Sequence, residues 1–146
     1  MKQIILCRGI QGSGKTTYAK QWAEVDPTHR IRFNYDDLRN MLGKYWVPSR
    51  EHILKRIRMA TITESMEEGY DIIVDNMNLN PKEVAWYEGV VKEFNERRGN
   101  TYHIVFLDFK TPVEECIKRD KSREHPVGEE IIRGTYERYK SFYESE

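Results

Sequence analysis

Residues 9–16 have the composition and spacing of a loop that binds phosphate groups. The segment reads Gly-Ile-Gln-Gly-Ser-Gly-Lys-Thr and matches the pattern G-x-x-x-x-G-K-[ST] at every fixed position. Glycines allow such a loop to turn its backbone N–H groups inward around a phosphate. Lys15 is then expected to reach the outer phosphates of a nucleotide, and the Thr16 hydroxyl to hold Mg²⁺. The residues expected to contact the nucleotide here are Gly9, Gln11, Gly12, Ser13, Gly14, Lys15, Thr16 and Thr17.

The segments on both sides of this loop support a nucleotide site. An apolar run at residues 4–7 predicts a strand before the loop, and a helix is predicted to begin near Lys15. The pattern requires this context, and the N-terminal dipole of the helix adds to the attraction for anions. The alternative is a glycine-rich turn that binds nothing, and the correct flanks make it the weaker interpretation. We therefore expect the chain to bind a nucleoside triphosphate.

An acidic residue and an arginine follow the second predicted strand. Residues 34–39 read Asn-Tyr-Asp-Asp-Leu-Arg. Phosphoryl transfer to a hydroxyl needs a carboxylate that accepts the proton, and an aspartate such as Asp36 meets this need. Arg39 lies on the same helical face and could grip a nearby phosphate with its fork of donors. The alternative is that Asp36 only caps the helix and that Arg39 is an ordinary surface residue.

The segment after the third predicted strand offers candidate metal ligands. Residues 75–81 read Asp-Asn-Met-Asn-Leu-Asn-Pro. An acidic residue at this position would bind Mg²⁺ directly or through water. A plain turn into a helix that starts at Pro81 is the other interpretation, with Asn80 as its cap. Asp75 and Asn76 both remain candidates for the metal site.

Basic residues follow the fourth predicted strand. Arg119 and Arg123 lie four residues apart, on one face of a helical segment. Such arginines can close over the phosphates and neutralise the charge that develops on the transferred group. Lys118 and Lys121 are interpreted instead as cations that favour a helix C-terminus. His125 is interpreted as a loop surface residue.

Alternating strands and helices must position these side chains. The patterns predict strands at 4–7, 31–34, 71–75 and 101–108, and helices at 15–24, 36–42, 48–68, from 81, 112–119 and 128–143. This alternation indicates an α/β fold, with a central four-stranded parallel sheet and helices on both faces. Ligands of such sheets bind at the carboxyl ends of the strands, where all four polar segments are expected to meet.

Several finer expectations concern which side chains are buried. The apolar run at 104–107 indicates a strand covered on both faces. The helix at 48–68 is expected to bury Ile53, Ile57 and Ala60, and to expose the basic residues Arg50, Lys55, Arg56 and Arg58. For Tyr45 and Trp46, stacking on a base is possible, but packing is the simpler interpretation. The stripe of Ile132, Tyr136, Tyr139 and Tyr143 is interpreted as core.

Composition indicates a globular protein of one domain spanning residues 1–146. The 24 basic and 24 acidic residues balance, which argues against a protein that coats nucleic acid non-specifically. Cys7 and Cys116 show no spacing typical of a metal site. The absence of a signal peptide and of a long apolar stretch makes a cytoplasmic setting without membrane contact the expectation.

The polar segments together resemble those of the kinase domain of phage-type polynucleotide 5′-hydroxyl kinases, members of the P-loop kinase superfamily. The resemblance covers nearly the whole chain. Its specific parts are residues 9–16, 35–39, 78–81 followed by Ala85-Trp86, and Lys118-Arg119 through Arg123. It implies a P-loop kinase fold with four parallel strands. It also implies Mg²⁺-dependent transfer of the γ-phosphate of ATP, or another NTP, to the 5′-hydroxyl end of DNA or RNA, in nucleic-acid end repair.

The same resemblance implies residue roles. Asp36 would be the general base, Arg39 the clamp on the acceptor's phosphate, and Lys15 with Thr16 would serve the donor and its Mg²⁺. Arg119 and Arg123 would be arginines of a lid over the nucleotide. Lys15, Asp36, Arg39 and Arg123 are accordingly the expected catalytic residues.

Two departures from that family affect the expectations. The chain stops where the kinase part of the phage enzyme stops, so we expect no 3′-phosphatase activity and leave the oligomeric state open. Alignment on residues 78–81 puts Asn76, rather than Asp75, where that family has its acidic residue, and a shift of one residue would exchange them. A small-molecule kinase, for a nucleoside or another metabolite, is the alternative function. A nucleotide-dependent binding switch without catalysis is a third.

Overall fold

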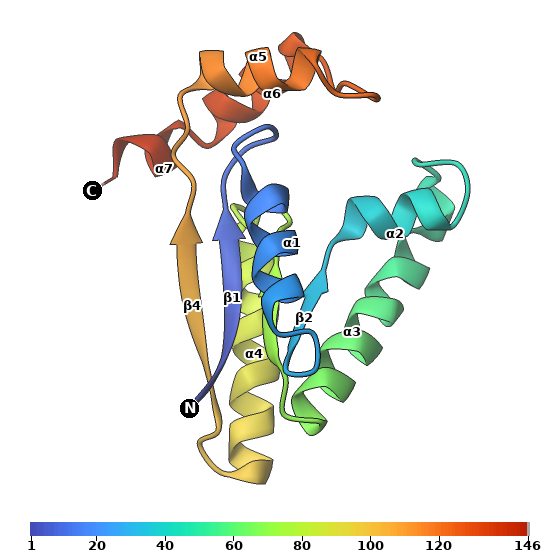
Figure 1. Cartoon of the computed structure of the whole chain (residues 1–146), viewed down its shortest axis with the longest axis vertical. Coiled ribbons are helices and arrows are strands. Elements are labelled where there is room, and N and C mark those ends of the chain that lie inside the picture. The colour runs from blue at the N-terminus through green and yellow to red at the C-terminus, as the bar shows by residue number, and fades with distance from the viewer. Residues whose placement is uncertain (146) are drawn as a thin grey trace.

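The computed structural model describes residues 1–145 and is built on a parallel four-stranded sheet (Figure 1). The strands are β1 (Lys2–Arg8), β2 (Arg30–Phe33), β3 (Asp71–Val74) and β4 (Tyr102–Asp108), in the order β2-β3-β1-β4. Each neighbouring pair is parallel, with Ile4 opposite both Ile72 and Ile104. The predicted α/β class and its four parallel strands are therefore confirmed.

Helices surround the sheet. They are α1 (Lys15–Val25), α2 (Tyr35–Met41), the 3₁₀ turn η1 (Pro48–Arg50), α3 (Glu51–Glu67), α4 (Pro81–Arg98), α5 (Val113–Lys121), α6 (Glu129–Arg138) and α7 (Lys140–Glu144). In Figure 1, α1 lies on the near face of the sheet and α4 on the far face. Within residues 1–145, no helix combines the length and apolar composition needed to cross a membrane.

The central strand β1 is buried on both faces because its side chains alternate between two cores. Ile4 and Leu6 join the larger core, which α3 and α4 cover, and both are fully buried. Ile5 and Cys7 point to the other face, where Ala19 of α1 packs against them. This burial explains the unbroken apolar run before the phosphate-binding loop, and it fixes the start of that loop rigidly.

The position of β4 differs from the expectation. It is an edge strand, and its apolar run is covered only in part, with Ile104, Val105 and Leu107 half-buried. Phe106 is 41% exposed, and the guanidinium of Arg8 lies 4.2 Å from its ring centroid. Arg8 also donates to Asp108 at the end of the strand. The Arg8 side chain thus covers Phe106 at a place where helices cover the inner strands.

The buried face of α3 also differs from the expectation. Ile57 is partly buried and packs against the core as expected, whereas Ile53 is 41% exposed and Ala60 is also exposed. The buried residues of the helix are Leu54, Arg58, Ile62, Ser65 and Met66, and an apolar pattern does not reveal the burial of the arginine and the serine.

The last helix is broken, where one helix over 128–143 was expected. Tyr139 separates α6 from α7, with φ −111° and ψ 26°. Ile132 is buried, and Tyr136 and Tyr143 pack around it, in a third core that includes Ile10 and Cys116. This core attaches α5 and α6 to the phosphate-binding loop, above the carboxyl ends of β1 and β4 (Figure 1).

Candidate active site

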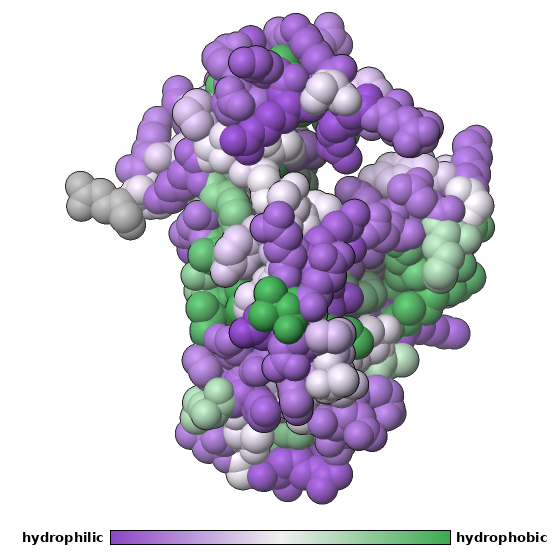
Figure 2. All heavy atoms as spheres, viewed as in Figure 1, coloured by the Kyte–Doolittle hydropathy of each residue, from purple (hydrophilic) through white to green (hydrophobic). Residues whose placement is uncertain are grey.

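A cleft of about 1430 Å³ lies at the carboxyl ends of the strands. Its walls come from the loops after β1, β2 and β3 and, on the β4 side, from α5 and the loop that follows α5. Figure 2 shows it as a hollow between the part formed by α5 and α6 and the part formed by α2. Its volume exceeds the roughly 300–1,000 Å³ typical of a pocket for one small ligand. The cleft therefore has room for a donor and an acceptor together.

The phosphate-binding loop depends on its glycines. Gly12 and Gly14 have φ values of 81° and 103°, which favour glycine. A Cβ atom on Gly12 would lie 2.6 Å from the carbonyl oxygen of Cys116 in α5. A Cβ on Gly9 would lie 2.8 Å from the carbonyl oxygen of Phe109. The loop therefore packs closely under the segment that follows β4. Gly9 supports the loop from behind, while the residues from Gln11 to Thr17 line the cleft.

Lys15 is held inside the loop. Its Nζ donates to the carbonyl oxygens of Gly9 and Ile10, at 2.7 and 2.8 Å, and to the Ser13 hydroxyl at 3.3 Å. Burial lowers the pKa of the lysine to about 8, with the side chain only 7% exposed. A bound phosphate would compete with the two carbonyls for this ammonium group.

Asn78 joins the loop after β3 to the strand β1. Its Nδ2 donates to the carbonyl oxygens of Cys7, Val74 and Asn76 at 2.8 to 3.1 Å. Within residues 1–145 it is the one non-glycine residue with positive φ, 53°, a conformation that asparagine tolerates. Sequence reasoning assigned Asn78 only to a motif and missed this function. Its buried polar side chain therefore connects the loop after β3, which carries the candidate metal ligands, to the start of the phosphate-binding loop.

Asp36 sits in the first turn of α2 with one oxygen engaged. The cap of α2 is Asn34, whose Oδ1 accepts from the N–H of Asp37 at 2.9 Å, so the capping interpretation of Asp36 is wrong. Oδ1 of Asp36 accepts from the Tyr45 hydroxyl at 2.6 Å and from Arg39 at 3.1 Å. Its Oδ2 has no hydrogen-bond partner within residues 1–145. The carboxylate is therefore oriented, and one oxygen is available to accept a proton.

Arg39 is fixed beside Asp36. Its guanidinium makes two hydrogen bonds to the Glu51 carboxylate, at 2.7 and 3.1 Å. These bonds raise the pKa of Arg39 above its usual value, so the group is always charged. It lies 5.4 to 5.7 Å from the ring centroids of Tyr35, Tyr45 and Trp46. The aromatic side chains and Glu51 hold the guanidinium at the edge of the cleft.

The two candidate metal ligands both have partners. The side chain of Asp75 is inaccessible, and both its oxygens accept from Arg32 at 2.8 to 3.1 Å. Arg32 also donates to Asp37, at 2.6 Å, and so ties the end of β3 to α2. The Oδ1 of Asn76 accepts from the N–H of Tyr35 at 2.9 Å. Both residues line the cleft, and in this structure their hydrogen bonds hold α2 in place.

The donor set fits a magnesium ion that arrives with the nucleotide. Among residues 1–145, no group of three His, Cys, Asp or Glu side chains could hold a metal ion by itself. Mg²⁺ usually takes only one or two protein ligands and completes its shell with phosphate oxygens and water. The exposed Thr16 hydroxyl at the start of α1 can supply one such ligand.

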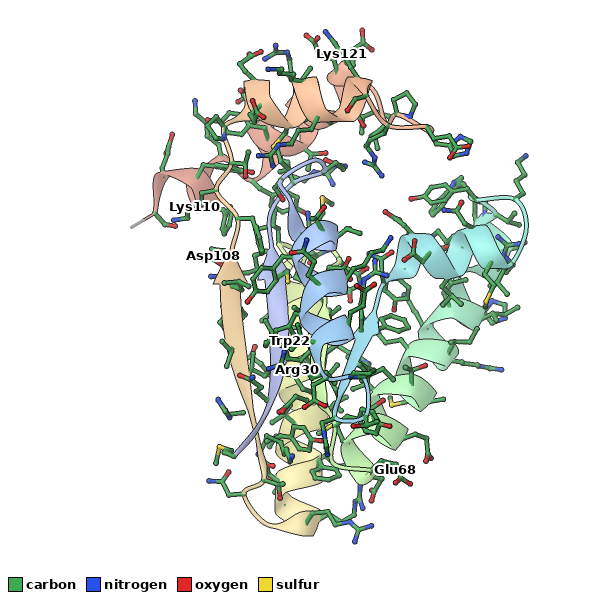
Figure 3. The ribbon with its side chains drawn as sticks, viewed as in Figure 1. Trp22, Arg30, Glu68, Asp108, Lys110 and Lys121 are labelled. Atoms are coloured by element: carbon green, nitrogen blue, oxygen red, sulfur yellow. The ribbon has the colours of Figure 1, made fainter. Side chains whose placement is uncertain are left out.

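Arginines from the segment after β4 lie across the cleft from α2. Arg119 and Arg123 both line it, and Arg119 donates to the Gly12 carbonyl oxygen at 3.4 Å. Buried Asp120 accepts from the N–H groups of Val127 and Gly128 at 2.8 and 2.9 Å. Asp120 thereby closes residues 121–128 into a compact loop. His125, expected at the surface, is exposed and also lines the cleft, whereas Lys121 lies at the outer end of α5 (Figure 3).

Three burial expectations near the site are wrong. Arg58, expected in solvent, is 4% exposed and lies 3.9 Å from the Trp86 ring centroid, paired with Glu83. Tyr45 and Trp46, expected to pack, are 45% and 54% exposed. The third concerns Tyr139, assigned to the core, which lines the cleft.

Nearly the whole chain is similar to known proteins. A family model described as an AAA domain matches residues 4–145. A putative bifunctional polynucleotide kinase/RNA ligase of Autographa californica nuclear polyhedrosis virus is 23% identical over 150 residues, which is 94% of this chain and 21% of that protein. An L-seryl-tRNA(Sec) kinase of Methanococcus maripaludis is 23% identical over 138 residues, which is 93% of this chain and 52% of that protein. The chain thus spans about a fifth and about half the length of these relatives.

A solved structure shares the fold. A chain in the Pnkp1/Rnl/Hen1 RNA repair complex superposes with a TM-score of 0.78 at 21% identity, over 98% of this chain and 45% of that chain. The architecture here is therefore that of a P-loop kinase.

Proposed function

Since the chain belongs to the AAA domain family and has the P-loop kinase fold, we propose that it is a polynucleotide 5′-hydroxyl kinase. It would transfer the γ-phosphate of ATP, or of another NTP, to the 5′-hydroxyl end of DNA or RNA, as a step in nucleic-acid end repair. The observation that carries the proposal is the pair of Asp36 and Arg39. They line the same cleft as Lys15 and Thr16 and leave one carboxylate oxygen free.

The proposed step uses these side chains in turn. The acceptor hydroxyl donates its proton to Oδ2 of Asp36 while its oxygen attacks the γ-phosphorus. The bond from that phosphorus to the bridging oxygen breaks, and the nucleoside diphosphate leaves. Lys15 moves from the loop carbonyls to the phosphates as the donor binds. Mg²⁺, when bound with Thr16, would neutralise charge on the donor phosphates.

Arginines on the two sides of the cleft would bind different substrates. Arg39, held by Glu51, would bind the first phosphate of the acceptor strand. Arg119 and Arg123 would lie against the donor phosphates and stabilise the charge on the transferred group. Arg39 has a ligand only if the acceptor carries a phosphate next to its hydroxyl. This favours the end of a nucleic acid over a metabolite without a phosphate.

A transfer assay tests this function. The full chain is incubated with γ-labelled ATP, Mg²⁺ and single-stranded or duplex DNA and RNA oligonucleotides that end in a 5′-hydroxyl, beside a panel of nucleosides and sugars. We expect label in the oligonucleotides and none in matched oligonucleotides that already carry a 5′-phosphate. Label in a nucleoside or sugar alone would establish the small-molecule kinase instead, and nucleotide binding without transfer to any acceptor would establish a switch.

A further inference from the structure

The segment between α2 and η1 presents two aromatic side chains to solvent, beside the proposed acceptor site. Tyr45 and Trp46, which we call the aromatic platform, are 45% and 54% exposed. Tyr45 lines the cleft and contacts Asp36 through its hydroxyl. The other two tryptophans, Trp22 and Trp86, are partly buried, under guanidinium groups at 4.6 and 3.9 Å (for Trp22 and Arg30, Figure 3). Trp46 thus stands apart as the exposed tryptophan of the described chain.

Contacts from neighbouring side chains hold the aromatic platform in place. Arg50 donates to the carbonyl oxygen of Leu42 at 3.0 Å and also to that of Lys44. These hydrogen bonds fix the backbone of the turn that precedes Tyr45. Pro48 opens η1 shortly after the platform. Arg39 lies 5.7 Å from both ring centroids of the platform and is itself fixed by Glu51. Rings fixed in this way can bind a flat ligand with little loss of conformational entropy.

The chemistry of the platform matches a nucleobase. Exposed aromatic rings bind bases by stacking, and each stacked base contributes about 1–3 kcal/mol irrespective of its identity. Arg39, 5.7 Å from the Tyr45 ring centroid, and Lys44, the preceding residue in the chain, supply positive charge near the phosphates of a bound strand. Because the Tyr45 hydroxyl contacts Asp36, the sugar of a nucleotide whose base lies on the rings would be close to that carboxylate.

We propose that Tyr45 and Trp46 bind the base of the acceptor's terminal nucleotide. This inference rests on the proposed function and names the feature by which the site selects a nucleic-acid end. The selection is for the presence of a base and not for its identity. An acceptor that lacks its terminal base would therefore bind more weakly.

The experiment compares two acceptors and three variants of the full chain. The acceptors are a 5′-hydroxyl oligonucleotide and the same strand with an abasic first residue. The variants are Trp46→Ala, Trp46→Phe and, as a matched control, Met41→Ala, which removes a side chain that is 73% exposed on α2. Because both positions are exposed, each of the three variants is expected to fold, and thermal unfolding checks this.

We expect Trp46→Ala to raise the KM for the intact oligonucleotide about tenfold, with kcat and the KM for ATP unchanged. Trp46→Phe should restore most of the affinity, and Met41→Ala should match the wild type. The abasic acceptor should raise the wild-type KM by at least as much, and it should raise the KM of Trp46→Ala by less, because only the Tyr45 ring remains there to contact a base. An unchanged KM in Trp46→Ala, or an abasic penalty in that variant as large as in the wild type, overturns the inference while the kinase function stands.

A binding measurement separates this failure from failure of the function itself. In an Asp36→Asn background without turnover, the oligonucleotide should quench tryptophan fluorescence, and Trp46→Phe should remove the quench. A wild-type protein that labels no oligonucleotide refutes the polynucleotide kinase function, and the inference then falls with it. Labelling without any quench refutes the platform alone.

Discussion

The hydroxyl of Tyr45 donates a hydrogen bond of 2.6 Å to Oδ1 of Asp36. Burial of the tyrosine, followed by this bond, raises the pKa of Tyr45 to about 12. The hydroxyl therefore remains a donor at any pH used to assay the protein. Together with Arg39 it engages Oδ1 and leaves Oδ2 for the acceptor hydroxyl. The loop after α2 thus completes a site whose main residues lie on the helix itself.

Replacing Tyr45 by Phe keeps the ring and removes only this hydrogen bond. We expect kcat for phosphate transfer to fall about fivefold, because Asp36 loses one of the two groups that orient it. The KM for ATP should not change, since Tyr45 is on the acceptor side. Steady-state kinetics with saturating oligonucleotide measure both quantities. A variant with wild-type kcat would show that Arg39 alone orients the carboxylate.

Replacing Asp36 by Asn removes the proposed proton acceptor. We expect transfer to fall by about 10²- to 10⁴-fold while ATP binding is retained, because the proposed role of the side chain is toward the acceptor. The matched control is Asp37→Asn, a neighbouring carboxylate that is 54% exposed and pairs with Arg32. It should retain activity within about threefold, as exposed ion pairs contribute little. Equal losses in the two variants would assign Asp36 a structural task.

Replacing Arg39 by Lys keeps the charge and removes the fork of donors. The two hydrogen bonds to Glu51 and the planar contact with the acceptor's phosphate both need that fork. We expect the KM for an oligonucleotide to rise about tenfold with the KM for ATP unchanged. Arg56→Lys, on the exposed face of α3, is the control. The proposed role is refuted if Arg39→Lys changes the donor KM instead.

Arg58 is a buried charged side chain whose loss should lower stability. It is 4% exposed, pairs with Glu83 and lies over the ring of Trp86. Arg58→Ala should lower the free energy of unfolding by about 3 kcal/mol in a denaturant titration, because it leaves a cavity and unpairs Glu83. Arg56→Ala, at an exposed position of the same helix, should change it by less than about 0.5 kcal/mol. A similar small effect for Arg58 would mean that the cluster relaxes around the loss.

The parts of the fold that depend on local patterns could be predicted from the sequence. The strand, glycine loop and helix at residues 4–25 follow from a motif in which each residue has its own physical reason. Asn80 also caps α4 as expected, with its Oδ1 accepting from the N–H of Lys82. The gathering of four polar segments at one end of the sheet followed from the rule for parallel strands.

Features that depend on the order of strands or on distant partners could not be predicted. Nothing in the run 104–107 reveals that β4 lies at an edge, because that depends on which strands pair. The burial of Arg58 requires Glu83 and Trp86, which lie on another helix. Likewise, the contact between Tyr45 and Asp36 depends on the path of the connecting loop, for which the sequence has no strong signal.

Lys15 leads to a prediction about the pH dependence of nucleotide binding. Burial lowers its pKa to about 8 in the free protein, where loop carbonyls hold it. Phosphates of a bound nucleotide favour the charged form, so the pKa must be higher in the complex. Binding then takes up a proton above pH 8, and affinity should be flat below that pH and fall by up to about tenfold per unit above it.

Titration of the protein with a fluorescent ATP analogue between pH 7 and 10 measures this effect. The triphosphate itself does not titrate in that range, because its last pKa is about 6. Lys15→Met, which has no titrating group, should bind more weakly and show no such slope. Wild-type affinity that stays constant from pH 8 to 10 would contradict the prediction, since the ammonium group would then be fully charged in the free loop. A slope that persists in Lys15→Met would assign the titration to another residue.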